Sequence, residues 1–152
     1  MQDRFKFRYF NKYVNKMVEP TSYENVDSVF ECIKQQVCFD SNISPLPYDH
    51  IGNGVVFMQC SGLKDKNGKL IYEGDIVKFA EYDWTDFSFK DWEQQKTVVI
   101  WGGDYDYPAF DLKGTDFDGT NGLAYIFGEG WTIEVIGNIY ENPELLEVIN
   151  DH

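Results

Sequence analysis

The sequence predicts a mainly β (β-rich α+β) protein, built as a small barrel or a strongly bent sheet. Three observations support this fold class. Short runs of strand-forming residues alternate with turn signals along most of the chain. Twelve phenylalanines and ten tyrosines supply rings of the kind that pack across pleated sheets. A hydrophobic content of 43% in 152 residues is enough for a buried core and argues against disorder.

The N-terminal part predicts a hairpin followed by one helix. Residues 5–18, FKFRYFNKYVNKMV, alternate in character, so we expect two strands, the second starting at Met17, with basic residues on the solvent face. Residues 21–37 open with a capping box, and their apolar residues recur at helical spacing. Several of these residues are β-branched, which keeps a pair of strands open as the alternative. Residues 39–54 contain prolines and glycines and predict a connecting loop.

The central part predicts strands joined by tight turns. A strand is expected over Val55–Gln59. Residues 63–70 favour a hairpin, because Asn67 and Gly68 both tolerate the positive φ of a two-residue turn. Strands over 70–72 and 76–79 are expected on either side of a bend or bulge at Gly74.

The C-terminal part predicts more strands and a short terminal helix. Residues 81–96 are polar and aromatic without a clear period, which favours a long loop or a protruding hairpin. The segment 113–130 has glycines around a short apolar run and predicts no defined element. Asn142 and Pro143 are typical of the cap and first turn of a helix. Three further strands are expected, over residues 97–101, 109–112 and 131–136.

The length and the net charge of the chain limit the number of domains and the kinds of binding partner that we expect. We expect a single domain over residues 1–152, with an N-terminal subdomain over 1–54 and a barrel over 55–152 as the finer division. The formal net charge is −13, and an acidic surface repels phosphate, so nucleic-acid binding is disfavoured. No stretch is apolar enough for a signal peptide or a membrane span, which predicts a cytoplasmic protein without a membrane partner. The three cysteines are expected to be reduced thiols.

Four blocks of the sequence carry most of these strands and turns. They are the opening FKFRYFNKYVNKMV, the central MQCSGLKDKNGKLIYEGDIVKF, the strand TVVIW and the closing EVIGNIYENPELL. Together they resemble the YopX family of phage and prophage proteins. The resemblance implies a mostly β protein with an SH3-like small barrel, encoded by a phage or prophage and present in the bacterial host cell. It carries over no catalytic residue, because the family has no established activity.

Turn chemistry accounts for most polar residues in these blocks, so we assign them folding roles. Glycine permits tight turns or the close approach of two backbones. An aspartate such as Asp75 can bond nearby backbone amides in an Asx-type turn. The residues of this structural motif are Gly62, Asn67, Gly68, Gly74, Asp75, Gly137 and Pro143.

No catalytic, metal or cofactor site is predicted. The run from Asp116 to Asn121 resembles the start of a calcium loop, but Phe127 stands where the bidentate glutamate belongs. His50 lies in a proline-rich loop and His152 is the last residue printed, so neither is singled out as a general base. We therefore expect a non-enzymatic protein. The alternative, a hydrolase or ligand pocket, requires a deep cleft with convergent polar groups.

Aromatic residues set among acids are the candidate contacts with a protein partner, because rings beside polar groups anchor interfaces. The competing interpretation is a satellite core at one end of the barrel. A homo-oligomer is compatible with the same rings. Two other functions stay open. One is an acidic nucleic-acid mimic that inhibits a host defence or DNA-handling protein, and the other is DNA contact through the basic N-terminal hairpin, which the net charge opposes. The candidate contact residues are Trp84, Phe87, Phe89, Trp92, Tyr105 and Tyr107.

Overall fold

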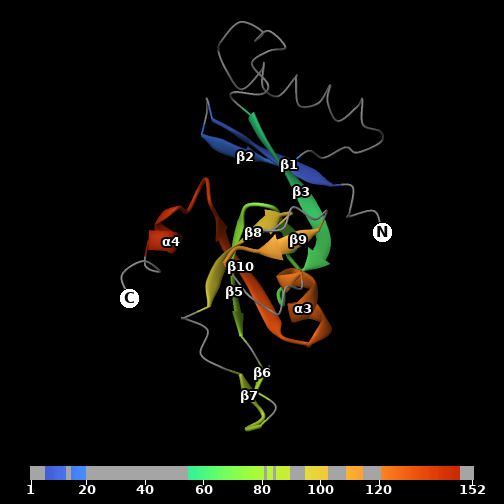
Figure 1. The fold of residues 1–152 in the computed structure, drawn as a ribbon. Helices are drawn as coiled ribbons and strands as arrows, with labels where there is room; N and C mark the ends of the chain where they lie inside the picture. The colour runs from blue at the N-terminus through green and yellow to red at the C-terminus, as the bar shows by residue number, and fades with distance from the viewer. Residues whose placement is uncertain are drawn as a thin grey trace, which may run out of the picture. The chain divides into compact units, whose positions relative to one another are not determined.

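A computed structural model describes residues 6–12, 15–19, 55–80, 82–83, 85–89, 95–102, 109–114 and 121–147. Within them the protein is mainly β, with two four-stranded antiparallel sheets, a two-stranded hairpin and two short helices (Figure 1). The predicted fold class, including the strongly bent sheet, is confirmed. The predicted helix at 21–37 and loop at 39–54 lie outside the described residues. The chain divides into two compact units, Met1–Gly62 and Leu63–His152.

The N-terminal unit contains the predicted hairpin. Strand β1 (Phe7–Asn11) pairs antiparallel with β2 (Lys16–Val18) on one side and with the first part of β3 (Val55–Lys64) on the other. The connection between β1 and β2 passes through Asn15, whose φ is +53°. β3 is longer than the predicted strand at 55–59 and has β4 (Leu70–Tyr72) as its other neighbour.

The prediction that the basic residues line the solvent face of this hairpin is wrong for Arg8. Arg8 is 3% exposed, and Tyr9 and Phe10 are also buried although neighbouring side chains in a strand point to opposite faces. β1 is therefore covered on both faces, and burial no longer alternates along it. Lys12 and Lys16 are exposed, as predicted.

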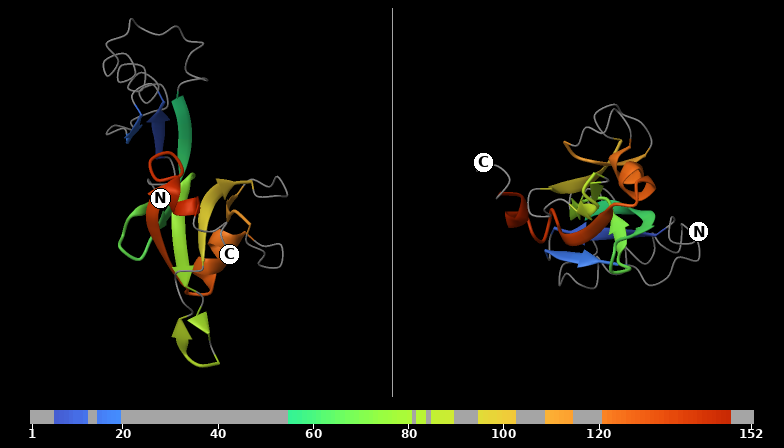
Figure 2. Two further views of the ribbon diagram at one scale, coloured as in Figure 1. Left: turned by 90° about the vertical axis from the view of Figure 1, so that its left-hand side faces the viewer. Right: turned by 90° about the horizontal axis from the view of Figure 1, so that it is seen from below.

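The second sheet has the strand order β10-β5-β8-β9 and curls into a half-barrel (Figure 2). Its strands are β5 (Asp75–Ala80), β8 (Lys96–Trp101), β9 (Phe110–Leu112) and β10 (Thr132–Asn138). β5 is central, pairing antiparallel with β10 and with β8. The strands that the sequence predicts in this part of the chain are all present, with boundaries shifted by one or two residues.

Helix α3 (Gly122–Gly128) bridges the two edges of the half-barrel, because it contacts both β9 and β10. Its N-cap is Asn121, whose Oδ1 accepts a hydrogen bond from the Ala124 N–H at 3.2 Å. Leu123 and Ile126 lie one turn apart and are fully buried. The segment 113–130, which predicts no element, therefore supplies the helix that closes this sheet.

The core of the C-terminal unit lies between the curled sheet and α3. Trp131 packs at its margin, with its ring stacked on Phe79 at 6.4 Å between centroids and edge-on to Tyr125 at 5.5 Å. Every strand of the curled sheet contributes a buried apolar side chain. The buried core residues are Ile71, Val77, Phe79, Val99, Leu112, Leu123, Ile126, Ile133 and Val135.

The end of β10 contains a bulge and a close backbone approach. Val135 lies opposite Val77, and Gly137 lies opposite Ile76, so Ile136 is the extra residue. Gly137 has no positive φ; its role is space, because a Cβ there would lie 2.6 Å from the Asn142 Oδ1.

The predicted terminal helix is confirmed as α4 (Glu144–Glu147). It follows Pro143, whose carbonyl accepts a hydrogen bond from the Leu146 N–H at 3.1 Å. Asn142 turns the chain into this helix, and its Oδ1 also accepts from the Asn138 N–H at 3.2 Å. The Asn142 side chain thus joins the end of β10 to the start of α4.

We expect Gly137→Ala to lower the free energy of unfolding by about 1–3 kcal/mol, because the added methyl group displaces the Asn142 side chain from the Asn138 N–H. Urea unfolding followed by tryptophan fluorescence measures the change. In the double variant Gly137→Ala/Asn142→Ala the two losses should not add, because both act on the same contact. Full additivity would show that Gly137 is required for another reason.

Candidate functional site

The segment at 81–96 forms the protruding hairpin that the sequence allows. Strand β6 (Tyr82–Asp83) pairs antiparallel with β7 (Ser88–Phe89). The hairpin follows β5 along the chain and extends away from the sheet that contains β5 (Figures 1 and 2). We call residues 85–88 the hairpin tip; all four are exposed.

The hairpin tip is held in shape by Asp86. Its Oδ1 accepts a hydrogen bond from the Ser88 N–H at 2.9 Å and a second one from the Ser88 hydroxyl. This is an Asx turn, in which a side-chain oxygen replaces a backbone carbonyl. The turn fixes the backbone of Phe87, the residue between them.

Two features of Phe87 do not stabilise the folded protein, and one of them, its backbone angle, is unfavourable. Its side chain is 74% exposed, the largest value among the exposed large hydrophobic residues of the described chain. Its φ is +57°, in the left-handed region that bulky L-residues avoid and that glycine or asparagine adopts more readily. Neither feature helps folding. A strained, exposed ring at the end of a projecting hairpin therefore points to a role outside the fold.

Of the other predicted contact residues, only Phe89 lies within the described part of the chain. Phe89 lies in β7, paired with Tyr82. Another exposed ring, Trp101, ends β8 and is 46% exposed. It lies edge-on to Phe110 at 4.8 Å, and Phe110 packs on the core, so Trp101 extends the core as a satellite. Trp84, Trp92, Tyr105 and Tyr107 lie outside the described residues.

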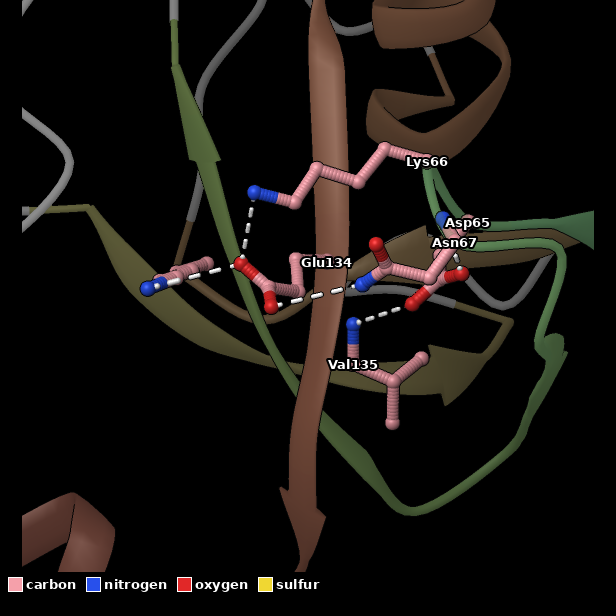
Figure 3. Close-up of polar contacts among 6 residues, drawn as sticks. Asp65, Lys66, Asn67, Glu134 and Val135 are labelled. Carbon is pink, nitrogen blue, oxygen red and sulfur yellow. Dashed lines mark hydrogen bonds and ion pairs between the residues drawn. The ribbon is translucent and has the colours of Figure 1, made fainter.

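A second cluster of polar residues surrounds the turn at 65–69, which we call the Asp65 turn (Figure 3). Asp65 is 7% exposed. Its Oδ1 accepts from the N–H groups of Asn67 and Lys69, both at 2.9 Å. Its Oδ2 accepts from the Val135 N–H at 3.0 Å. One carboxylate therefore holds the turn and joins it to β10.

The Asp65 turn also covers the free edge of β10. The Ile133 carbonyl and the Val135 N–H both point away from β5, because residues two apart in a strand present their polar groups to the same side. The carbonyl accepts from the Lys66 N–H at 2.9 Å, and the N–H bonds Asp65. The turn thus supplies the hydrogen bonds that another strand would supply, and this edge is not open for pairing at these residues.

The predicted hairpin over 63–70 is present between β3 and β4, but of the two residues expected to tolerate a positive φ only Gly68 adopts one. Gly68 has φ +81°, whereas Asn67 is not among the residues with positive φ. The turn is longer, because Asp65 organises it through the Asn67 and Lys69 amides. The Asn67 side chain is free to reach β10, and its Nδ2 donates to the Glu134 Oε1 at 3.4 Å.

Glu134 joins three partners on the outer face of β10 (Figure 3). Its Oε2 lies 3.0 Å from Lys66 Nζ and 3.4 Å from Lys78 Nζ. Lys78 is its cross-strand neighbour on β5. The hydrogen bond from Lys66 and the charge of Lys78 outweigh partial burial and lower the pKa of Glu134 below its ordinary value of 4.5.

Two further buried aspartates bond backbone amides. Asp75, at 1% exposed, accepts from the Tyr72 N–H at 2.8 Å. It therefore bonds a nearby backbone amide as predicted, but the Asx-type geometry is wrong, because the bonded amide precedes the aspartate by three residues. Asp111 accepts from the Leu112 N–H at 2.8 Å and from the Gly122 N–H at 2.7 Å, which joins β9 to the start of α3. The bends at Gly62 and Gly74 have φ of +80° and +83°.

The described residues contain no group of three or more His, Cys, Asp or Glu side chains placed to hold a metal ion. Within the same ranges, none of the helices has the length and apolar character needed to span a membrane. Cys60 is buried, and its Sγ accepts a hydrogen bond from the Gly62 N–H at 3.4 Å. Cys32, Cys38, His50 and His152 lie outside the described residues.

The fold and its turns place the protein in a structural class: it is a small, mainly β domain in which a short helix closes a curled antiparallel sheet. The chain belongs to the YopX family, whose model, described as YopX protein, matches residues 6–147. The structure is similar to the crystal structure of protein EF1440 from Enterococcus faecalis, with 24% sequence identity and a TM-score of 0.51 over 93% of this chain and 96% of that chain. This likeness concerns the fold alone. No curated protein matches the chain.

We expect Asp65→Ala to lower the free energy of unfolding by about 3 kcal/mol or more, because three backbone N–H groups lose their acceptor. Asp65→Asn should cost less, since it keeps one acceptor oxygen and loses chiefly the bond to Val135. Urea denaturation provides the measurement. Asp86→Ala is the matched control, because it removes an exposed aspartate with the same turn role and should cost about 1 kcal/mol or less. Equal losses at the two positions would contradict the role given to Asp65.

We expect Glu134→Gln to lower stability at pH 7 by about 0.5 kcal/mol, because the lysine partners are partly exposed and solvent screens the pairs. The folded-state pKa of Glu134 is lowered, so its contribution is present above pH 4.5 and is lost as the pH falls through the folded-state pKa. Unfolding free energies of the two proteins, measured from pH 7 down to about pH 3, should therefore converge. A difference that stays constant with pH would mean that the charge of Glu134 is not responsible.

Proposed function

We propose that this YopX family protein is a non-enzymatic protein-interaction module, encoded by a phage or prophage and acting in the cytoplasm of its bacterial host. The single observation that carries the proposal is Phe87. A fully formed turn presents this ring to solvent at the end of a hairpin. Aromatic rings are the side chains most often found as energetic anchors of protein interfaces.

The position of Phe87 distinguishes an anchor from an ordinary surface residue. An isolated exposed hydrophobic side chain needs no explanation in a soluble protein. Phe87, however, combines exposure with an unfavourable φ, which selection for stability alone would replace with glycine or asparagine. Because Asp86 fixes the turn, the backbone at Phe87 has little conformational freedom left to lose on binding.

The buried acids support a non-enzymatic role. Asp65, Asp75 and Asp111 each accept hydrogen bonds from backbone N–H groups at 2.7–3.0 Å. These hydrogen bonds hold turns and connections between elements, so each of the three carboxylates has a structural role. Burial is one way in which a protein tunes a carboxylate for acid–base chemistry, but in the described part of the chain these three buried carboxylates hold the fold.

We expect Phe87→Asn to abolish capture of the protein partner, because it removes the ring while asparagine tolerates the left-handed backbone. Loss of an anchor of this kind weakens binding by roughly 30-fold, or about 2 kcal/mol. The measurement is an affinity pull-down of the tagged protein from bacterial lysate treated with nuclease, read by mass spectrometry. Phe87→Tyr is the matched control and should retain the partner.

Stability measurements separate a binding role from a folding role. Phe87→Asn should unfold at the same urea concentration as the natural protein or a higher one, because the exposed ring and its φ do not stabilise the fold. If both variants and the natural protein recover the same proteins, the proposal is wrong. Recovery of untagged copies of this chain alone would identify the partner as a homo-oligomer.

A further inference from the structure

We propose that the hairpin tip docks on a basic protein surface, with the Phe87 ring in an apolar depression that lysine or arginine side chains surround. This inference rests on the proposed function and names the chemistry of the partner. It starts from the charge around the ring. Asp86 is the one charged residue of the four at the tip, and it is exposed next to Phe87.

The sequence around the tip is acidic as well as aromatic. Residues 81–96 contain five acids and two lysines, and the whole chain has a net charge of −13. Such a field attracts cationic surfaces from a distance and raises the rate of encounter. The exposed ring supplies the short-range part of the contact, because apolar burial holds a complex once charge has brought the two surfaces together.

The same charge argues against two other binding partners for the tip, a second copy of this chain and a nucleic acid. A second copy of this chain has the same net charge of −13, so two tips approaching one another repel. A nucleic acid presents phosphates, which the acidic segment also repels, and stacking platforms for single strands need cations along the backbone track. A cationic protein surface with an apolar depression can bind the Phe87 ring and the Asp86 carboxylate at the same time.

Asp86 has two roles that one substitution separates. Its Oδ1 accepts the two hydrogen bonds from Ser88 that hold the turn, and its charge faces solvent. Asparagine keeps an acceptor oxygen at the same position, so Asp86→Asn preserves the Asx turn and removes the charge. Glu144→Gln is the matched control, since it removes one charge from an exposed acid on α4, outside the hairpin.

The experiment selects ligands from a random-peptide display library on the full-length protein, in parallel with an identical selection on the Phe87→Asn variant. We expect the selected peptides to be enriched in lysine or arginine around at least one large apolar residue. Their affinity for the natural protein should fall about tenfold between roughly 50 mM and 500 mM NaCl. Asp86→Asn should weaken binding about 2- to 5-fold, and Glu144→Gln should weaken it less.

The outcomes distinguish this inference from the function on which it rests. If the natural protein and Phe87→Asn select the same peptides, Phe87 is not an anchor and both ideas fail. If selection depends on Phe87 but yields neutral or acidic peptides, or affinities that salt and Asp86→Asn leave unchanged, the protein-binding function stands and the basic partner is excluded. Enrichment of this chain's own hairpin sequence would assign the tip to self-association and would also overturn the inference.

Discussion

The geometry of the half-barrel depends on one buried carboxylate. Asp65 satisfies three backbone N–H groups, two within its own turn and one on β10, so a local turn and a distant strand are fixed by the same two oxygens. Hydrogen bonds to an ionised acceptor are stronger than those between neutral groups, and a buried N–H without an acceptor is costly. The carboxylate thus replaces a neighbouring strand at the edge of β10, where the bulge at Ile136 already disturbs the regular pairing with β5.

The same device recurs where other connections meet this sheet. Asp75 closes the bend between β4 and β5 through the Tyr72 N–H, and Asp111 joins β9 to the N-terminus of α3 through the Gly122 N–H. Each is a short side chain that bonds backbone groups which the sheet and helix leave unsatisfied. A chain with 26 acids and a net charge of −13 therefore uses part of its negative charge internally, and exposed acids such as Asp86 and Glu144 contribute to the field outside.

Local sequence patterns predicted the strands and turns well, because turn residues and strand-forming runs act over a few positions. They failed where tertiary context decides. Arg8 alternates with aromatic residues as a surface residue would, but β1 is covered on both faces. Helix α3 has an N-cap at Asn121 and two core residues one turn apart. It was not predicted because Gly122 and Gly128 lower the helix propensity of this short segment. Phe87 was identified as a candidate contact because it lies in an aromatic and acidic segment, but its positive φ could not be predicted from the sequence. The hydrogen bond between Asp65 and Val135 could not be predicted either, because the two residues are 70 positions apart.

The strand order of the curled sheet has a consequence for how the protein is made. β10 follows β5, β8 and β9 in the chain but pairs with β5 at the opposite edge. While the ribosome synthesises the chain from its N-terminus, β5 can pair with β8 early, but its other edge stays without a partner until β10 has emerged. Until then, the Asp65 carboxylate lacks the Val135 N–H, and α3 has one of its two edge strands to pack on. Until β10 has emerged, the nascent chain therefore presents an unpaired strand edge beside uncovered apolar side chains, a combination that favours chaperone binding or aggregation. We expect closure of the half-barrel to be a late event in folding, because it needs pairing between strands that are far apart in the sequence.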